Sequence, residues 1–229
     1  MNHLIILPGW MQNATHWEAV HTQLSLHKVP HTIIDLPGFG SQPYDANLSD
    51  LNSISAWFKE KIDSLNIEAP VVLVGHSYGG RVAVSAAASL KGPISRIVLI
   101  GSPNLYMPTW RTRVLRVLSA LVSPIKRFIP EFVRMKFRSD DYQAVKGTKM
   151  QLLFSSIIAH DQSEELSALS VPVQLLWGRN DTQAPIEIAM KMRTLIPACE
   201  LEIIEGAGHD LHLERPQLLA SKLASYANT

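Results

Sequence analysis

Short runs of valine, isoleucine and leucine recur along the chain, with longer and more polar stretches between them. Most of these runs are apolar throughout rather than alternating, which is typical of strands covered on both faces in a parallel sheet. We expect six such strands, at residues 4–7, 32–36, 71–74, 96–100, 173–177 and 201–204.

Patterns of helical length lie between the apolar runs. They predict helices at residues 15–28, 48–66, 78–90, 185–196 and 214–226. Strands that alternate with helices are typical of a doubly wound α/β sheet. The expected fold class is therefore α/β, with a mostly parallel sheet of about six strands.

One connection is longer than the others. The strand that ends at Ile100 is followed by the next strand only near Val171, and this distance is too long for a single crossover helix. Prolines divide the connection into short pieces whose apolar residues have helical spacing. We expect residues 103–160 to form an inserted helical cap, and residues 1–102 and 161–229 to form the core.

The composition is that of a globular protein, with 46% hydrophobic residues and a mean hydropathy of +0.07. Cys199 is the single cysteine, so no internal disulfide can form, and we expect a buried, inert thiol. No apolar run is long enough to span a membrane, and no secretion signal is recognisable, so we expect a cytoplasmic protein. We expect neither a nucleic acid partner nor a metal or other cofactor.

Charge is distributed unevenly along the chain. Residues 106–150 contain ten lysines and arginines but three acidic residues, a net charge of +7, although the whole chain carries only +1. The expected cap is therefore basic and the expected core acidic. A solvated helical face explains such a pattern without any partner, and an acidic protein or an anionic lipid surface are the alternatives.

The strongest chemical motif is Gly-x-Ser-x-Gly-Gly, in which Ser77 lies between a predicted buried strand and a predicted helix. A serine at such a turn projects its hydroxyl above the sheet, and Gly75 and Gly79 remove the Cβ atoms that would clash there. The following helix N-terminus favours developing negative charge. The motif predicts a serine nucleophile, although a tight turn alone also explains Ser77.

A serine nucleophile needs a base and an acid that orients the base. In this strand order the acid precedes the histidine, and each follows a strand. Asp181 follows the strand at 173–177, and His209 follows the strand at 201–204. We expect these two residues to complete a triad with Ser77. Asp210 is the alternative acid, and a helix cap is the alternative role of Asp181.

These motifs resemble the α/β-hydrolase superfamily over essentially the whole chain, which implies a hydrolase fold with a lid. The segment 7–14 is similar to the superfamily's oxyanion loop, and Trp10 takes the position whose N–H binds the oxyanion. Pro8 stands where histidine is usual. The segment 35–41 is similar to a structural turn of the family, in which we expect Asp35 to tie the loop by hydrogen bonds.

Within the superfamily, Trp10 with the following Asn-Ala pair and the turn at 35–41 are most similar to the pimeloyl-[acyl-carrier protein] methyl ester esterases. This resemblance implies a carboxylic ester substrate, an acyl-enzyme on Ser77, and contacts of Trp10 and Tyr78 with the ester. It also implies an acidic acyl-carrier protein as a partner for the basic cap. Carbon–carbon bond hydrolysis, lipase-like or thioesterase activity, and a non-catalytic ligand receptor or scaffold remain the alternatives.

Overall fold

The computed structural model describes residues 1–87, 90, 94–107, 145–148 and 150–228. Its centre is a sheet of six strands, in the spatial order β2-β1-β3-β4-β5-β6, and every neighbouring pair is parallel. The strands are β1 (His3–Leu7), β2 (His31–Ile33), β3 (Val71–His76), β4 (Ile94–Ile100), β5 (Val173–Gly178) and β6 (Cys199–Ile204). The predicted parallel α/β sheet is confirmed.

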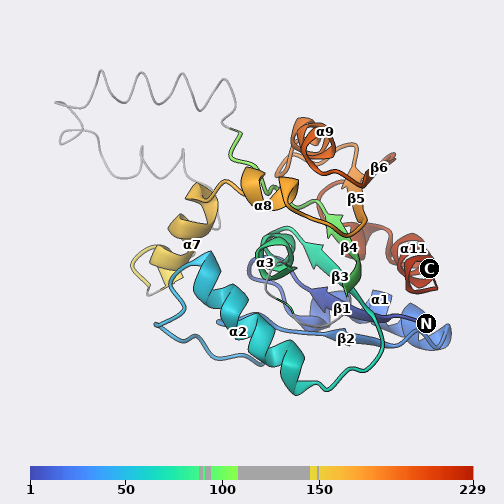
Figure 1. The fold of residues 1–229 in the computed structure, drawn as a ribbon, viewed down its shortest axis with the longest axis horizontal. Coiled ribbons are helices and arrows are strands. Elements are labelled where there is room, and N and C mark those ends of the chain that lie inside the picture. The colour runs from blue at the N-terminus through green and yellow to red at the C-terminus, as the bar shows by residue number, and fades with distance from the viewer. Residues whose placement is uncertain (88–89, 91–93, 108–144, 149, 229) are drawn as a thin grey trace.

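Helices cover both faces of this sheet (Figure 1). They are α1 (Glu18–Leu26, after the short 3-10 helix Ala14–Trp17), α2 (Leu51–Ser64), α3 (Tyr78–Ala87), α7 (Met150–Ala159), α8 (Ser163–Ser167), α9 (Ile186–Leu195), α10 (Leu211–Glu214) and α11 (Pro216–Ala227). The five predicted core helices are all present. The predicted start of the second was three residues early, because Asp50 caps the N-terminus of α2 through its bond to the Ser53 N–H.

Alternation along the strands divides the apolar core into two layers. Ile5 and Leu7 of β1 pack with α2, α3, α8 and α9 on one face, whereas Leu4 and Ile6 pack with α1, α10 and α11 on the other. Central strands such as β3 are buried at every position, which explains why their sequences are apolar throughout. At the edge, β2 ends at Ile33, earlier than predicted.

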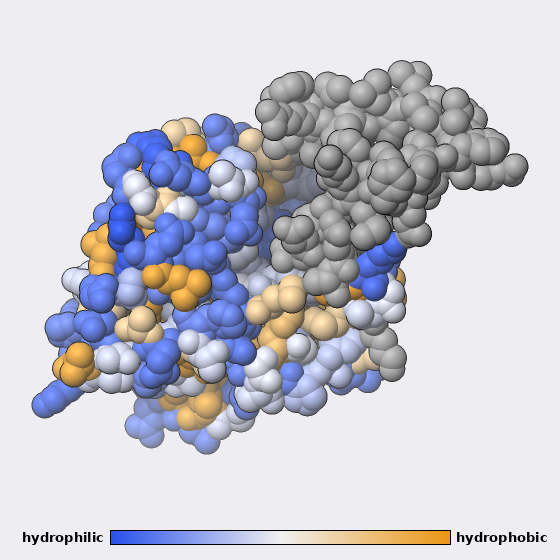
Figure 2. Space-filling model, turned by 180° about the vertical axis from the view of Figure 1, so that it is seen from behind, coloured by the Kyte–Doolittle hydropathy of each residue, from blue (hydrophilic) through white to orange (hydrophobic). Residues whose placement is uncertain are grey.

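The two ends of the chain meet on the face that carries α11. The Asn2 N–H donates to the Ala227 carbonyl at 2.7 Å, and both ends lie on the same side of the ribbon (Figure 1). When the molecule is seen from behind the view of Figure 1, apolar residues on the described surface form small separate groups among hydrophilic ones (Figure 2). Among the described residues, no helix has the length and apolar character that crossing a membrane requires.

Most of the predicted cap, residues 103–160, lies outside the described residues. Its described parts are its two ends: residues 103–107 follow β4, and α7 precedes α8. The domain boundaries and the basic surface predicted for residues 106–150 therefore stay predictions.

Candidate active site

Ser77 occupies the sharp turn between β3 and α3, with a positive φ of 49°. Its backbone is fixed by bonds from both sides. The Ser77 N–H donates to the Ile100 carbonyl at 2.9 Å, and the Ser77 carbonyl accepts from the Ser102 hydroxyl at 2.7 Å and from the Gly80 N–H at 3.1 Å. A left-handed conformation is strained for a residue with a side chain, and strain of this kind is concentrated at functional sites.

The glycines around Ser77 are required by close backbone packing. A Cβ atom on Gly75 would lie 2.4 Å from the Gly80 Cα, and one on Gly79 would lie 2.2 Å from the Leu7 carbonyl oxygen. Neither contact can be relieved by moving a side chain, because both neighbours are backbone atoms. The role that the sequence predicted for Gly75 and Gly79 is therefore confirmed.

His209 is oriented by Asp181. The His209 Nδ1 lies 2.8 Å from the Asp181 Oδ2, and the side chain of Asp181 is fully buried. The other carboxylate oxygen, Oδ1, accepts the N–H groups of Gln183 at 2.9 Å and Ala184 at 2.7 Å. Backbone N–H groups in the segment before α9 thus hold the Asp181 carboxylate in place. Because His209 contacts Asp181 through Nδ1, its Nε2 is available to accept a proton.

The alternative acid, Asp210, makes different contacts. Its Oδ1 accepts a hydrogen bond from the Gln12 Nε2 at 3.0 Å and lies 3.9 Å from the Nε2 of His76. The structure therefore places Asp181, and not Asp210, against the imidazole of His209.

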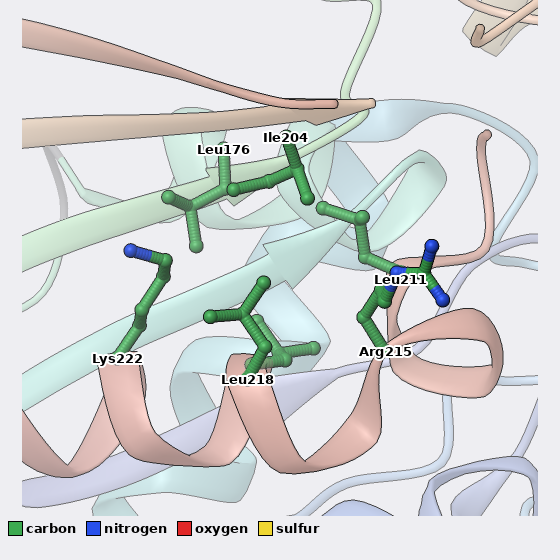
Figure 3. A pocket seen from close by; sticks show the side chains of 7 residues that line it. Leu176, Ile204, Leu211, Arg215, Leu218 and Lys222 are labelled. Atoms are coloured by element: carbon green, nitrogen blue, oxygen red, sulfur yellow. The ribbon is translucent and has the colours of Figure 1, made fainter. Parts of the chain in front are cut away.

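One pocket, at the carboxyl ends of β1, β3, β5 and β6, brings three of the five predicted site residues together, whereas Asp181 and Tyr78 lie outside its lining. Ser77, His209 and Trp10 line it, together with Gly9, Gln12, His76, Gln183 and Asp210. Parallel sheets commonly place their sites at this edge. A second, apolar pocket lies between α11 and the strands β5 and β6, where Leu218 and Lys222 face Leu176 and Ile204 (Figure 3). No serine, threonine or cysteine of the described chain lines that pocket.

Aromatic side chains pack beside the polar pocket. The ring of Trp10 lies 4.9 Å from that of Phe154, 5.0 Å from that of Phe39 and 5.3 Å from that of Tyr78, measured between centroids. Among the described residues, the Trp10 Nε1 and the Tyr78 hydroxyl are buried without a hydrogen-bond partner. Burial raises the pKa of Tyr78, so its hydroxyl keeps its proton.

The loop at residues 35–41 has the structural role that was predicted. Asp35 Oδ1 accepts the Ala14 N–H at 2.7 Å, and its Oδ2 accepts the Ser41 N–H at 2.8 Å. Gly38 and Gly40 have φ values of 92° and 54°. Asp35 thereby joins this turn to the segment that follows the Trp10 loop.

Three polar residues near the site were given no role by the sequence. Gln12 contacts both Gly9 and Asp210, Arg81 lies buried four residues after Ser77, and His212 lies buried three residues after His209. Arg81 donates to the carbonyls of Pro103 at 2.6 Å and of Ile157 and His160 at 2.8 Å each, so it joins the two described ends of the predicted cap to α3. The sequence offered one signal for the buried role of Arg81, because this arginine stands in a predicted helix of small apolar residues.

His76, Asp210 and His212 are the residues whose arrangement comes nearest to a metal site within the described part of the chain. One potential ligand atom from each lies within 4.8 Å of the others. However, the His76 ring nitrogens already face the Gln12 Oε1 at 3.0 Å and the His209 carbonyl at 3.1 Å, and the Asp210 Oδ1 accepts from Gln12. A metal ion would have to displace these bonds.

Cys199 lies away from this cluster. It is partly rather than fully buried, and burial raises the pKa of its thiol to about 11.

Comparison with known proteins gives consistent results. The family model described as the alpha/beta hydrolase family matches residues 4–222. The chain is 28% identical to the pimeloyl-[acyl-carrier protein] methyl ester esterase of Vibrio vulnificus, over 98% of this chain and 93% of that protein. It is 25% identical to the 2-hydroxy-6-oxononadienedioate/2-hydroxy-6-oxononatrienedioate hydrolase of Cupriavidus pinatubonensis, over 77% of this chain and 68% of that protein.

Solved structures show the same fold. The esterase EaEST of Exiguobacterium antarcticum superposes with a TM-score of 0.76, covering 100% of this chain and 92% of that one at 20% sequence identity. At this identity the likeness establishes the fold and leaves the substrate open.

Proposed function

The chain belongs to the alpha/beta hydrolase family, and from that premise we propose that it is a serine esterase whose triad is Ser77, His209 and Asp181. The observation that carries the proposal is the 2.8 Å contact between the buried Asp181 and His209, which lines the same pocket as Ser77. A serine held at a positive φ beside an oriented imidazole is the arrangement that nucleophilic catalysis requires.

In the proposed reaction, the Ser77 hydroxyl attacks the ester carbonyl while the Nε2 of His209 takes its proton. Asp181 holds His209 with its Nδ1 protonated and stabilises the imidazolium that forms. The backbone N–H groups of Trp10 and Tyr78 stabilise the oxyanion of the tetrahedral intermediate. The intermediate collapses as His209 gives its proton to the departing alcohol, which leaves an acyl group on Ser77.

Water completes the proposed cycle. His209 removes a proton from the water molecule, which attacks the acyl carbonyl, and a second tetrahedral intermediate forms. Its collapse returns the proton to the Ser77 oxygen and releases the carboxylic acid. Atoms balance over the cycle: one ester and one water give one acid and one alcohol.

For the substrate we propose the methyl ester of an acyl chain carried by an acyl-carrier protein. The name of the Vibrio vulnificus relative supports this class of substrate. The aromatic group of Trp10, Phe39, Tyr78 and Phe154 supplies an apolar wall for an acyl chain. The +7 charge of residues 106–150 would attract an acidic carrier protein. We propose that both proteins meet in the cytoplasm, the location that we expect from the sequence.

The triad is tested by measuring turnover of p-nitrophenyl butyrate by wild-type protein and variants whose folding is checked by circular dichroism. We expect Ser77→Ala and His209→Ala to lower kcat/KM by at least about 1,000-fold, because covalent catalysis is lost. Asp181→Asn should lower it far more than the matched variant Asp210→Asn. Near wild-type turnover by Ser77→Ala would exclude this nucleophile, and tight ester binding without turnover by the wild type would favour the receptor alternative.

The carrier is tested by reversing two charges in the basic segment, Arg134→Glu with Arg138→Glu. We expect slower association with a carrier-bound acyl ester and unchanged turnover of p-nitrophenyl butyrate, because electrostatic steering acts on encounter. The matched control is Lys191→Glu with Arg193→Glu on α9, where both residues are exposed. Equal effects of the two double variants would exclude specific docking of the carrier.

Carbon–carbon bond hydrolysis is the second candidate, because the Cupriavidus pinatubonensis relative is named for a dienedioate substrate. The same triad would act on a ketone carbonyl rather than an ester. Incubation of the protein with a 2-hydroxy-6-oxo-dienoate distinguishes carbon–carbon bond hydrolysis from ester hydrolysis. Cleavage of the carbon–carbon bond is measured as a loss of the dienol absorbance of this substrate. We expect kcat/KM to be at least about tenfold higher for the ester.

A further inference from the structure

Segments at the carboxyl ends of four strands line the polar pocket, and the side chain of Gln12 contacts three of these segments. Gln12 follows β1, in the loop that contains Trp10. Its Oε1 accepts the Gly9 N–H at 3.1 Å, and its Nε2 donates to the Asp210 Oδ1 at 3.0 Å. Its Oε1 also lies 3.0 Å from the Nδ1 of His76, the residue before Ser77. Gln12 thus joins the Trp10 loop to the loop that contains His209.

The Trp10 loop is a tight turn that Gln12 closes twice. The Gln12 N–H donates to the Gly9 carbonyl at 3.1 Å, and its side chain accepts from the Gly9 N–H. Met11 has the positive φ, 56°, of a residue in such a turn. Neither bond uses the N–H of Trp10, which stays available for an oxyanion.

Other residues of the loop cannot supply this attachment. Pro8 has no N–H and no polar side chain. Gly9 packs so closely that a Cβ atom there would lie 2.8 Å from the His76 Nδ1. The amide of Gln12 is therefore what fixes the distance between the Trp10 backbone and the residue next to His209.

His76 adds to this attachment in the neutral form that carries its proton on Nδ1, because only that form donates to the Gln12 Oε1. Burial, together with the nearby His212 and His209, holds the pKa of His76 well below 6.5, so its ring carries one proton. That proton is donated either through Nδ1 to Gln12 or through Nε2 to the His209 carbonyl. In both forms Gln12 keeps its bonds to Gly9 and Asp210.

We propose that Gln12 is a positioning residue, which holds the N–H of Trp10 at the place where the oxyanion forms, in fixed relation to His209. The inference rests on the proposed esterase function. Its consequence is that losing the Gln12 amide weakens binding of the transition state and leaves binding of the ground-state ester nearly unchanged.

The first experiment replaces Gln12 by methionine, which keeps the length of the side chain and removes its hydrogen bonds. With p-nitrophenyl butyrate we expect kcat to fall about 10- to 100-fold, with KM within about twofold of wild type, because small displacements at a reacting centre have effects of this size. Gln217→Met, at an exposed position of α11, is the matched control and should leave both constants unchanged.

A transition-state mimic separates positioning from general structural damage. A trifluoromethyl ketone with the butyryl chain forms a tetrahedral adduct on serine, so its inhibition constant should weaken by the same factor as kcat/KM in Gln12→Met. The planar butyramide should inhibit both proteins equally. If kcat stays within about threefold, or if KM changes instead of kcat, the proposed role of Gln12 is wrong.

A swap of the two bonded side chains keeps the test independent of any folding defect in Gln12→Met. Gln12→Glu alone places a carboxylate against Asp210 and should lower kcat. Gln12→Glu with Asp210→Asn restores one donor and one acceptor, and we expect it to recover most of the lost kcat. No recovery would contradict the inference. If wild-type protein neither turns over the ester nor reacts with a fluorophosphonate at Ser77, the proposed function itself fails.

Discussion

Arg81 and His212 are both buried polar side chains, and they lie against opposite faces of the sheet. Arg81 lies beside α7 in the layer of α2 and α3, and its guanidinium donates to three backbone carbonyls. His212 stacks on Trp17 in the layer of α1 and α11, with ring centroids 4.6 Å apart, and among the described residues neither of its ring nitrogens has a partner.

The two environments change ionisation to different extents. Burial lowers the pKa of Arg81 to about 10, while Asp161 and Glu165 oppose the shift, so the guanidinium stays charged at neutral pH. Burial, together with the nearby His16 and His209, lowers the pKa of His212 to about 3, so the imidazole is neutral at neutral pH. A buried cation persists where carbonyls surround it, whereas an unpaired base loses its charge.

Replacing Arg81, whose guanidinium is hydrogen-bonded, should have the largest effect on the free energy of unfolding. Arg81→Met leaves the carbonyls of Pro103, Ile157 and His160 without their donor, and we expect the free energy of unfolding to fall by about 3 to 5 kcal/mol. Urea unfolding followed by circular dichroism measures this loss. Arg81→Lys keeps the charge but reaches fewer carbonyls, so it should lose about half as much. Equal stability of Arg81→Met and wild type would show that the three bonds add nothing.

The unpaired imidazole of His212 should make the stability of the protein depend on pH. Because the pKa of His212 is near 3 in the folded protein and near 6.5 in the unfolded chain, the unfolded state binds more protons between these values. Stability is therefore fully present above pH 6.5 and falls as the pH is lowered. The variant His212→Phe should flatten this dependence by about 1.4 kcal/mol per pH unit between pH 6 and pH 4. Parallel pH profiles would mean that His212 is protonated in the folded state.

At pH 7.5 the same variant should have the smallest effect. His212→Phe removes two unpartnered nitrogens and keeps an aromatic ring against Trp17, so its stability should lie within about 1 kcal/mol of wild type. His212→Ala is the control that opens a cavity, and we expect it to lose about 2 to 3 kcal/mol. A loss above about 2 kcal/mol in His212→Phe would indicate that the imidazole makes a hydrogen bond that matters.

Much of the framework around Ser77 could be predicted from local patterns. All six strands were expected from apolar runs, because burial on both faces removes polar residues from a parallel strand. Gly75 and Gly79 were expected from the turn geometry of the motif. Asp181 and His209 were expected from their order after successive strands, and the structure places them in contact.

The roles of Gln12, Arg81 and His212 could not be predicted in the same way. Gln12 bonds Asp210, 198 positions away, and Arg81 bonds the Ile157 carbonyl, 76 positions away. Hydrophobic periodicity describes neighbours on one element and contains no information about such partners. His212 lies in a short helix, α10, where nothing in the sequence distinguishes a buried imidazole from an exposed one.

The left-handed backbone of Ser77 has a consequence for how this chain can change over generations. Glycine adopts a φ of 49° without the strain that a Cβ atom causes, which is of the order of 1 to 3 kcal/mol. Glycine at this position would relieve the strain but would remove the hydroxyl. A descendant of this chain with glycine at position 77 would therefore have lost the nucleophile and would have a less strained fold.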